Sequence, residues 1–219
     1  MSEAWDAYRA HFGHLVSIAF VVYVLIALLS LLLAVLLGWL GVVVAGLIGL
    51  AGVFWLQGAL VLAIDDVRDG RADLSLRQTL ERVRPRLNTL TLAGLLAAIG
   101  IGIGFLLLIV PGFVLLTFWL LIVPAIMLEG AGVRRSFGRS YELVRGHGWS
   151  VFGVIVLTVL VLVLVRILER TLDAAFDSWV VDLVLVIASQ TLTAPFVALT
   201  WTMTYYRLRA LETAPPAVA

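Results

Sequence analysis

The feature that most constrains this chain is an uncharged stretch of fifty residues. Between His14 and Asp65 the sequence contains no Asp, Glu, Lys, Arg or His. As a helix this stretch would be roughly 75 Å long at 1.5 Å per residue, whereas the hydrocarbon core of a bilayer is about 30 Å thick. It therefore predicts two membrane crossings, about 15–37 and 42–64, with a reversal at Gly38-Trp39-Leu40-Gly41.

Further uncharged runs predict four more crossings. Pro111-Gly112 divides the run that follows Leu87, because proline removes a backbone donor and glycine tolerates a turn. Apolar runs of this length favour helices over the alternating pattern of a membrane barrel. The predicted fold class is all-α and polytopic, with a single domain over 1–211 and a disordered cytoplasmic tail over 212–219. The remaining spans are expected at about 88–109, 113–128, 149–166 and 183–206.

Composition agrees with a membrane protein and excludes several function classes. The chain is 63% hydrophobic and 13% charged, which is too apolar for a water-soluble fold. A net charge of +1 gives no reason to expect a nucleic acid partner. The absence of cysteine excludes disulfides and thiolate chemistry, and no Ser, His or acid stands in a recognisable nucleophile motif. We therefore predict no catalytic site, no cofactor and no metal site.

The arginines predict the orientation. Basic residues concentrate on the cytoplasmic side of membrane proteins. With the N-terminus and C-terminus both in the cytoplasm, thirteen of the fifteen basic residues, all arginines, lie on that side. Only Arg166 and Arg170 lie opposite, in the polar segment 166–182.

Three short segments share a pattern of charged and apolar residues. Residues 5–11, 80–86 and 141–147 each carry an acid second and an arginine fifth. Around the second and third segments, apolar residues recur with helical spacing. We infer a possible threefold internal repeat, in which a cytoplasmic amphipathic helix precedes each helical hairpin.

These segments suggest a lipid-binding role. Arginines beside an anionic membrane surface contribute about 1 kcal/mol each to binding. The alternative is that the helices only cover the base of the bundle and satisfy the charge rule. The candidates for headgroup contact are Arg84, Arg86, Arg134, Arg135, Arg139 and Arg145.

Four polar residues in or at the ends of the spans are the other candidates. Gln57, Gln190 and Thr193 could bond neighbouring helices or line a wet path, and helix-to-helix bonding with a proline kink is the simpler interpretation. Glu129 could be a proton or cation ligand, although an interfacial ion-pair partner is the more common role of such a carboxylate.

One long run resembles a known family. It reads GIGFLLLIVPGFVLLTFWLLIVPAIMLEGAGVRRSFGRSYELVRGHGW, with Pro111-Gly112, Pro124, Glu129-Gly130, Arg139-Ser140 and Arg145-Gly146-His147 as its motifs. It resembles the membrane domain found with glycerophosphoryl diester phosphodiesterases and the related YciC-like bacterial membrane proteins. The resemblance implies a multi-pass protein of the bacterial cytoplasmic membrane with a link to lipids. No residue of the phosphodiesterase catalytic barrel is present to be carried over.

Two functions remain open from the sequence. The first is a non-catalytic membrane protein that binds lipid or a partner protein at its arginine-rich cytoplasmic face. The alternative is a small-solute or ion transporter or channel, with a polar path near the sixth span. The expected partners are membrane lipids and either a second copy of the chain or another membrane protein.

Overall fold

The computed structural model describes residues 2–68, 76–176 and 178–213, with side chains from Gly13 onward except those of His14, Leu76 and Ala175. Within these residues every regular element is a helix, as the sequence predicts. The elements are α1 (Ser2–Leu37), α2 (Trp39–Arg68), α3 (Leu76–Val83), the 3₁₀ helix η1 (Arg84–Arg86), α4 (Leu87–Leu107), α5 (Ile109–Trp119), α6 (Ile122–Glu129), α7 (Val133–Val144), α8 (Gly148–Phe176) and α9 (Trp179–Thr213).

Six helical segments in the described part are long and apolar enough to cross a membrane. They are α1 from Leu15, α2, the α3–α4 segment from Arg77, α5 with α6, α8 to Ala174, and α9. This confirms the predicted number of membrane-length helices. Within each helix the backbone hydrogen bonds are satisfied internally, which is the condition for standing in hydrocarbon.

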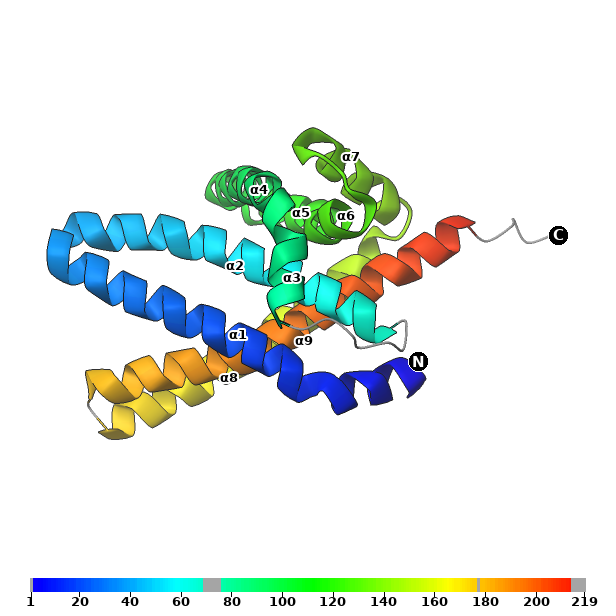
Figure 1. The fold of residues 1–219 in the computed structure, drawn as a ribbon. Helices are drawn as coiled ribbons and strands as arrows, with labels where there is room; N and C mark the ends of the chain where they lie inside the picture. Colours follow the sequence, from blue (N-terminus) through cyan, green and yellow to red (C-terminus); the bar gives the residue numbers. More distant parts are fainter. Residues whose placement is uncertain (1, 69–75, 177, 214–219) are drawn as a thin grey trace.

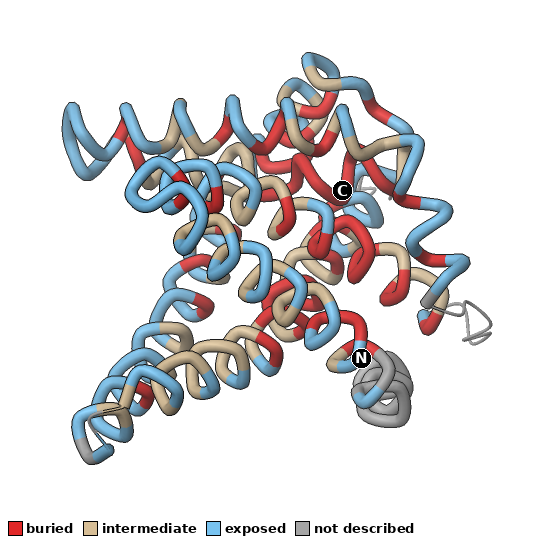
Figure 2. Tube along the Cα trace, turned by 60° about the vertical axis from the view of Figure 1, so that its left-hand side comes forward, coloured by how far each residue is buried: buried red, intermediate tan, exposed pale blue. Residues whose placement is uncertain are grey.

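The long helices pair with their neighbours in sequence. α1 packs against α2, α4 against α5, and α8 against α9. In Figure 1 the turn between α1 and α2 and the connection between α8 and α9 lie at the left, while the end of α9 lies at the right. The pairs converge toward this right-hand end and diverge toward their turns (Figures 1 and 2). The last turns of α2, α6 and α9 carry Arg68, Glu129 and Glu212. We call the right-hand end the charged end.

The reversal between α1 and α2 occurs where the sequence predicts it. Gly38 has a φ of +57°, in the left-handed region that glycine adopts without strain. Gly41 lies so close to α1 that a Cβ atom there would be 1.8 Å from the carbonyl oxygen of Leu33. Glycine at these two positions therefore allows a one-residue turn between two long helices.

The turn between α4 and α5 lies at Leu108 and not at Pro111-Gly112. Leu108 is extended, with φ −162° and ψ 148°, and α5 begins at the next residue. Pro111 falls in the first turn of α5, where its missing N–H has no intrahelical partner to lose. Gly112 serves packing instead, since a Cβ atom on Gly104 would lie 3.0 Å from the Gly112 Cα.

The fourth membrane segment is broken between α5 and α6. Leu120 and Leu121 form a turn, and Pro124 lies in the first turn of α6. The buried Ser140 hydroxyl of α7 donates to the Phe118 carbonyl at 2.6 Å and accepts from the Leu121 N–H at 3.1 Å. A side chain outside the helix thus satisfies backbone groups that the break leaves open.

Three other boundaries differ from those expected. The first amphipathic segment is continuous with the first span in α1. Much of the polar segment 166–182 is helical, because α8 continues to Phe176 and α9 begins at Trp179. Glu212, assigned to the tail, belongs to α9, and residues 214–219 lie outside the described residues. The threefold repeat stays a prediction.

Burial is concentrated where the helical pairs meet. The main hydrophobic cluster joins residues of α1, α2, α4, α6 and α9, among them Ile18, Leu60, Leu90, Ile126 and Ala198. Figure 2 shows that the helical pairs are mostly exposed near their turns. There the exposed side chains are large and apolar, such as Val35 and Leu106, which suits contact with acyl chains.

Candidate functional site

Three helices bring charged side chains together at the charged end. Glu129 occupies the last turn of α6, which ends at Gly130 with a φ of +70°. This left-handed residue turns the chain toward α7, which carries Arg139. The C-terminal turns of α9 contribute Tyr205 and Glu212. Residues far apart in sequence therefore meet at one place.

Arg139 is the centre of this polar cluster. Its Nε donates to both carboxylate oxygens of Glu129 at 2.9 Å, and its Nη1 and Nη2 donate to Glu212 at 2.8 and 2.7 Å. Tyr205 donates its hydroxyl to Glu129 Oε1 at 2.7 Å. The Arg139 and Glu129 side chains are only 18% and 16% exposed, so solvent screens the pair weakly. Paired geometry of this kind gives arginine–carboxylate contacts their directionality.

The carboxylates keep Arg139 positively charged. The hydrogen bonds that Arg139 donates to Glu212, and those it donates to Glu129, raise the pKa of Arg139 and outweigh the opposing effect of burial. Glu129 forms an ion pair with Arg139 in the structure. The cluster thus joins α6, α7 and α9 at the charged end.

A second polar contact joins α2 to α9 nearby. Tyr206 donates its hydroxyl to the carboxylate of Asp65. The Arg68 guanidinium carbon lies 3.7 Å from the centre of the Tyr206 ring, and Arg68 is 3.9 Å from Asp65. This stacking is a cation–π contact. Adjacent tyrosines on α9 therefore bind carboxylates of two different helices.

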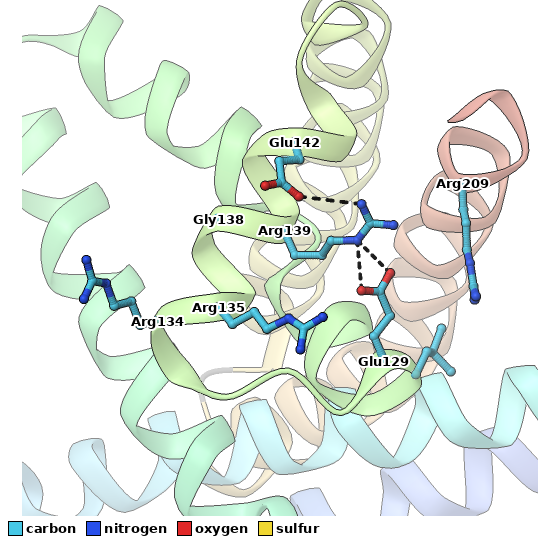
Figure 3. A pocket seen from close by; sticks show the side chains of 8 residues that line it. Glu129, Arg134, Arg135, Gly138, Arg139, Glu142 and Arg209 are labelled. Carbon is cyan, nitrogen blue, oxygen red and sulfur yellow. Dashed lines mark hydrogen bonds and ion pairs between the residues drawn. The ribbon is translucent and has the colours of Figure 1, made fainter. Parts of the chain in front are cut away.

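A cavity opens beside the Arg139 cluster. It has a volume of about 920 Å³ and is lined by Leu128, Glu129, Arg134, Arg135, Gly138, Arg139, Glu142 and Arg209. We call it the arginine pocket. In Figure 3, Arg135 and Arg209 lie on opposite sides of Glu129, whereas Arg134 points outward from α7. Four guanidinium groups and two carboxylates thus surround one water-accessible space.

The guanidinium groups of this pocket are not equivalent. Arg139 is saturated by Glu129 and Glu212, with Glu142 3.7 Å from its Nη1. Arg134, Arg135 and Arg209 form no hydrogen bond or ion pair among the described residues. An entering anion would therefore meet Arg135 and Arg209, whereas Arg134 points outward, and it would have to displace a carboxylate to reach Arg139.

The structure separates the six arginines predicted to contact headgroups. Arg134 and Arg135 line the arginine pocket, and Arg139 forms its inner wall. Arg86 turns inward and donates to the Ile126 carbonyl in α6, so it stabilises a helix end. Arg84 is exposed in η1, and Arg145 is exposed at the end of α7.

The polar residues of the spans do not converge on one site. Gln57 is buried in α2, and its Oε1 has no hydrogen-bond partner. Gln190 lines a cleft between α1, α2 and α9. Thr193, Thr200 and Thr204 donate their hydroxyls to carbonyls one turn earlier in α9. These threonines therefore donate their hydroxyl hydrogens to their own helix.

Sequence reasoning missed three members of the site: Tyr205, Arg209 and Glu212. Tyr205 and Glu212 are seven residues apart, which places them on one face of a helix, two turns from each other. That spacing was a usable signal, provided that α9 was extended past residue 206. Among the described residues, no three His, Asp or Glu side chains cluster in a way that could hold a metal ion.

Comparisons with known proteins identify no relative of this chain. No family model, no curated protein and no solved structure matches this chain. The resemblance to the YciC-like membrane proteins therefore stays a prediction.

Proposed function

We propose that this chain is a non-catalytic, multi-pass membrane protein that binds the negatively charged headgroups of phospholipids in the arginine pocket. The observation that carries the proposal is that Arg134, Arg135 and Arg209 line that pocket and form no hydrogen bond or ion pair with any residue the structure describes. Arginine offers planar, paired donors that match phosphate oxygens.

The location of the pocket supports a headgroup as ligand. It lies where α6 and α9 end, and both belong to membrane-length segments. The proposed orientation puts this end at the cytoplasmic membrane surface, where anionic lipids attract basic side chains. A volume of about 920 Å³ also leaves room for a headgroup larger than a single phosphate.

The balance of charge within the pocket supports the same ligand. Glu129 and Glu212 more than neutralise Arg139, and with Glu142 three carboxylates stand against the four guanidinium groups around the pocket, which leaves a net charge of +1. An anion would therefore be attracted without leaving a buried cation unpaired in the empty pocket. Arg139 serves to position the pocket wall, and Arg135 and Arg209 are the expected phosphate contacts.

The experiment compares short-chain phosphatidylglycerol with short-chain phosphatidylcholine, each titrated by thermophoresis against the protein in neutral detergent. The double variant Arg135→Gln/Arg209→Gln should weaken phosphatidylglycerol binding by about 10- to 30-fold, because each surface arginine contributes about 1 kcal/mol. Phosphatidylcholine binding should change little.

The matched control is Arg82→Gln/Arg170→Gln, which removes the same charge from exposed positions outside the pocket. It should retain most of the preference for phosphatidylglycerol. Equal losses in both double variants would mean that net charge alone attracts the lipid, and the pocket proposal would fail.

A further inference from the structure

A second cavity lies on another face of the molecule, between α1, α2 and α3. It has a volume of about 670 Å³, within the roughly 300–1,000 Å³ of pockets that bind small ligands. Its walls are nearly all apolar and include Leu25, Leu29, Ile48, Trp55 and Leu80. We call it the α3 groove.

The groove has one apolar end and one charged end. Ile26 of α1 packs against Gly52 of α2 near the middle of both spans, and the antiparallel pair places Leu29 and Ile48 just beyond that level, toward the α1–α2 turn. The opposite end is formed by α3 and η1, which contribute Arg77, Glu81 and Arg84. The groove therefore leads from apolar side chains of α1 and α2 to the charged side chains of α3 and η1.

The length of the groove suits an extended acyl chain. Along α2 it extends from position 48 to position 59, about 16 Å at 1.5 Å per residue. Half of a hydrocarbon core of about 30 Å is about 15 Å. An acyl chain that enters beside α3 and η1 would thus reach the apolar end of the groove.

The charges at the open end favour an anion. Arg77 is held by Glu81, with Nε 3.0 Å from Oε1. Arg84 forms no hydrogen bond or ion pair among the described residues. The α3 end of the groove therefore presents one guanidinium group, that of Arg84, that no carboxylate compensates within the described residues.

We propose that the α3 groove binds one acyl chain of an anionic membrane phospholipid, with the phosphate of that lipid against Arg84. The length of the groove, its apolar walls and the single unpaired cation at its end jointly select this occupant. The site is separate from the arginine pocket, and the proposal does not depend on that pocket binding a headgroup.

The first test blocks the groove. Leu25 is 60% exposed and lines the groove, whereas Leu28 is 59% exposed on the same helix and lies outside its lining. The variants Leu25→Trp and Leu28→Trp are purified in neutral detergent with added long-chain phosphatidylglycerol, and retained lipid is counted by native mass spectrometry. Leu25→Trp should lose the tightly retained phospholipid and Leu28→Trp should keep it. Equal retention in the two variants would overturn the proposal.

The second test addresses the charge. Arg84→Gln should reduce the preference for phosphatidylglycerol over phosphatidylcholine in the retained lipid by about fivefold. Arg82→Gln, two residues earlier and outside the groove, should leave the preference unchanged. If Arg82→Gln has the same effect as Arg84→Gln, the phosphate does not lie against Arg84.

The pocket variant Arg135→Gln/Arg209→Gln separates the two sites. It should retain the groove lipid even when it loses binding of short-chain phosphatidylglycerol. If Leu25→Trp keeps its lipid while this double variant loses headgroup binding, only the groove proposal has failed. If Leu25→Trp loses its lipid while this double variant keeps headgroup binding, only the arginine-pocket proposal has failed.

Discussion

At the scale of single residues, arginines with the same side chain make different contacts in the structure. Arg86 bonds the carbonyl of Ile126 and Arg139 bonds two carboxylates, so both hold helices together. Arg135 and Arg209 line the arginine pocket and form no hydrogen bond or ion pair with the residues that the structure describes. The same guanidinium chemistry thus stabilises the fold at some positions and stays available to a ligand at others.

Ser140 provides a residue-scale prediction about stability. Ser140→Ala should lower the free energy of unfolding by about 1–3 kcal/mol, because it leaves the Phe118 carbonyl and the Leu121 N–H without the hydroxyl at the α5–α6 break. The measurement is chemical unfolding in detergent, followed by circular dichroism.

Ser136 is the control for this change. It is equally buried and lies on the same helix, but its hydroxyl donates only to the Val133 carbonyl within α7. Ser136→Ala should therefore cost clearly less than Ser140→Ala. Similar losses would indicate that the bridge across the break contributes nothing.

At the scale of elements, the uncharged runs predict the number of membrane-length helices but not every boundary. A proline is compatible with a turn and also with the first turn of a helix, so Pro111 alone could not place the reversal at Leu108. The polar residues 166–182 looked like a loop. Pairing of α8 with α9 extends both helices into that segment, where the buried Glu169 accepts from Arg166 and Ser189.

The α4–α5 pair supports an element-scale prediction. Gly104→Ala should destabilise the protein by about 1–3 kcal/mol, because the new methyl group would lie 3.0 Å from the Gly112 Cα and would force the helices apart. The readout is again the free energy of unfolding in detergent.

Gly102 is the matched position, since a Cβ atom there meets no atom within 4 Å. Gly102→Ala should be neutral or slightly stabilising, because alanine favours the helix by up to about 1 kcal/mol. A loss at Gly102 as large as that at Gly104 would show that helix contact is not the cause.

At the scale of the whole molecule, the folded chain carries most of its charge at one end. Glu129, Arg139 and Glu212 meet there, although they come from α6, α7 and α9. Arg166 and Arg170 lie toward the other end of α8. From this segregation, the positive-inside rule predicts the proposed orientation.

The orientation can be tested because the chain has no cysteine. Glu142→Cys and Arg170→Cys introduce single thiols at exposed positions toward opposite ends, with side chains 67% and 76% exposed in the native chain. In intact cells a membrane-impermeant maleimide should label only the thiol at position 170. The thiol at position 142 should react after permeabilisation, and the reverse pattern would invert the proposed topology.

The sequence by itself determined the class of fold, since whether a segment suits hydrocarbon or water depends on its own composition. The uncharged runs therefore predict six membrane-length helices without knowledge of their packing. Only the tertiary structure decided which charges meet. Arg139 and Glu212 are 73 positions apart, and their contact depends on how α7 and α9 pack, a relation that no local pattern contains. The arginine pocket and the α3 groove arise from that packing for the same reason.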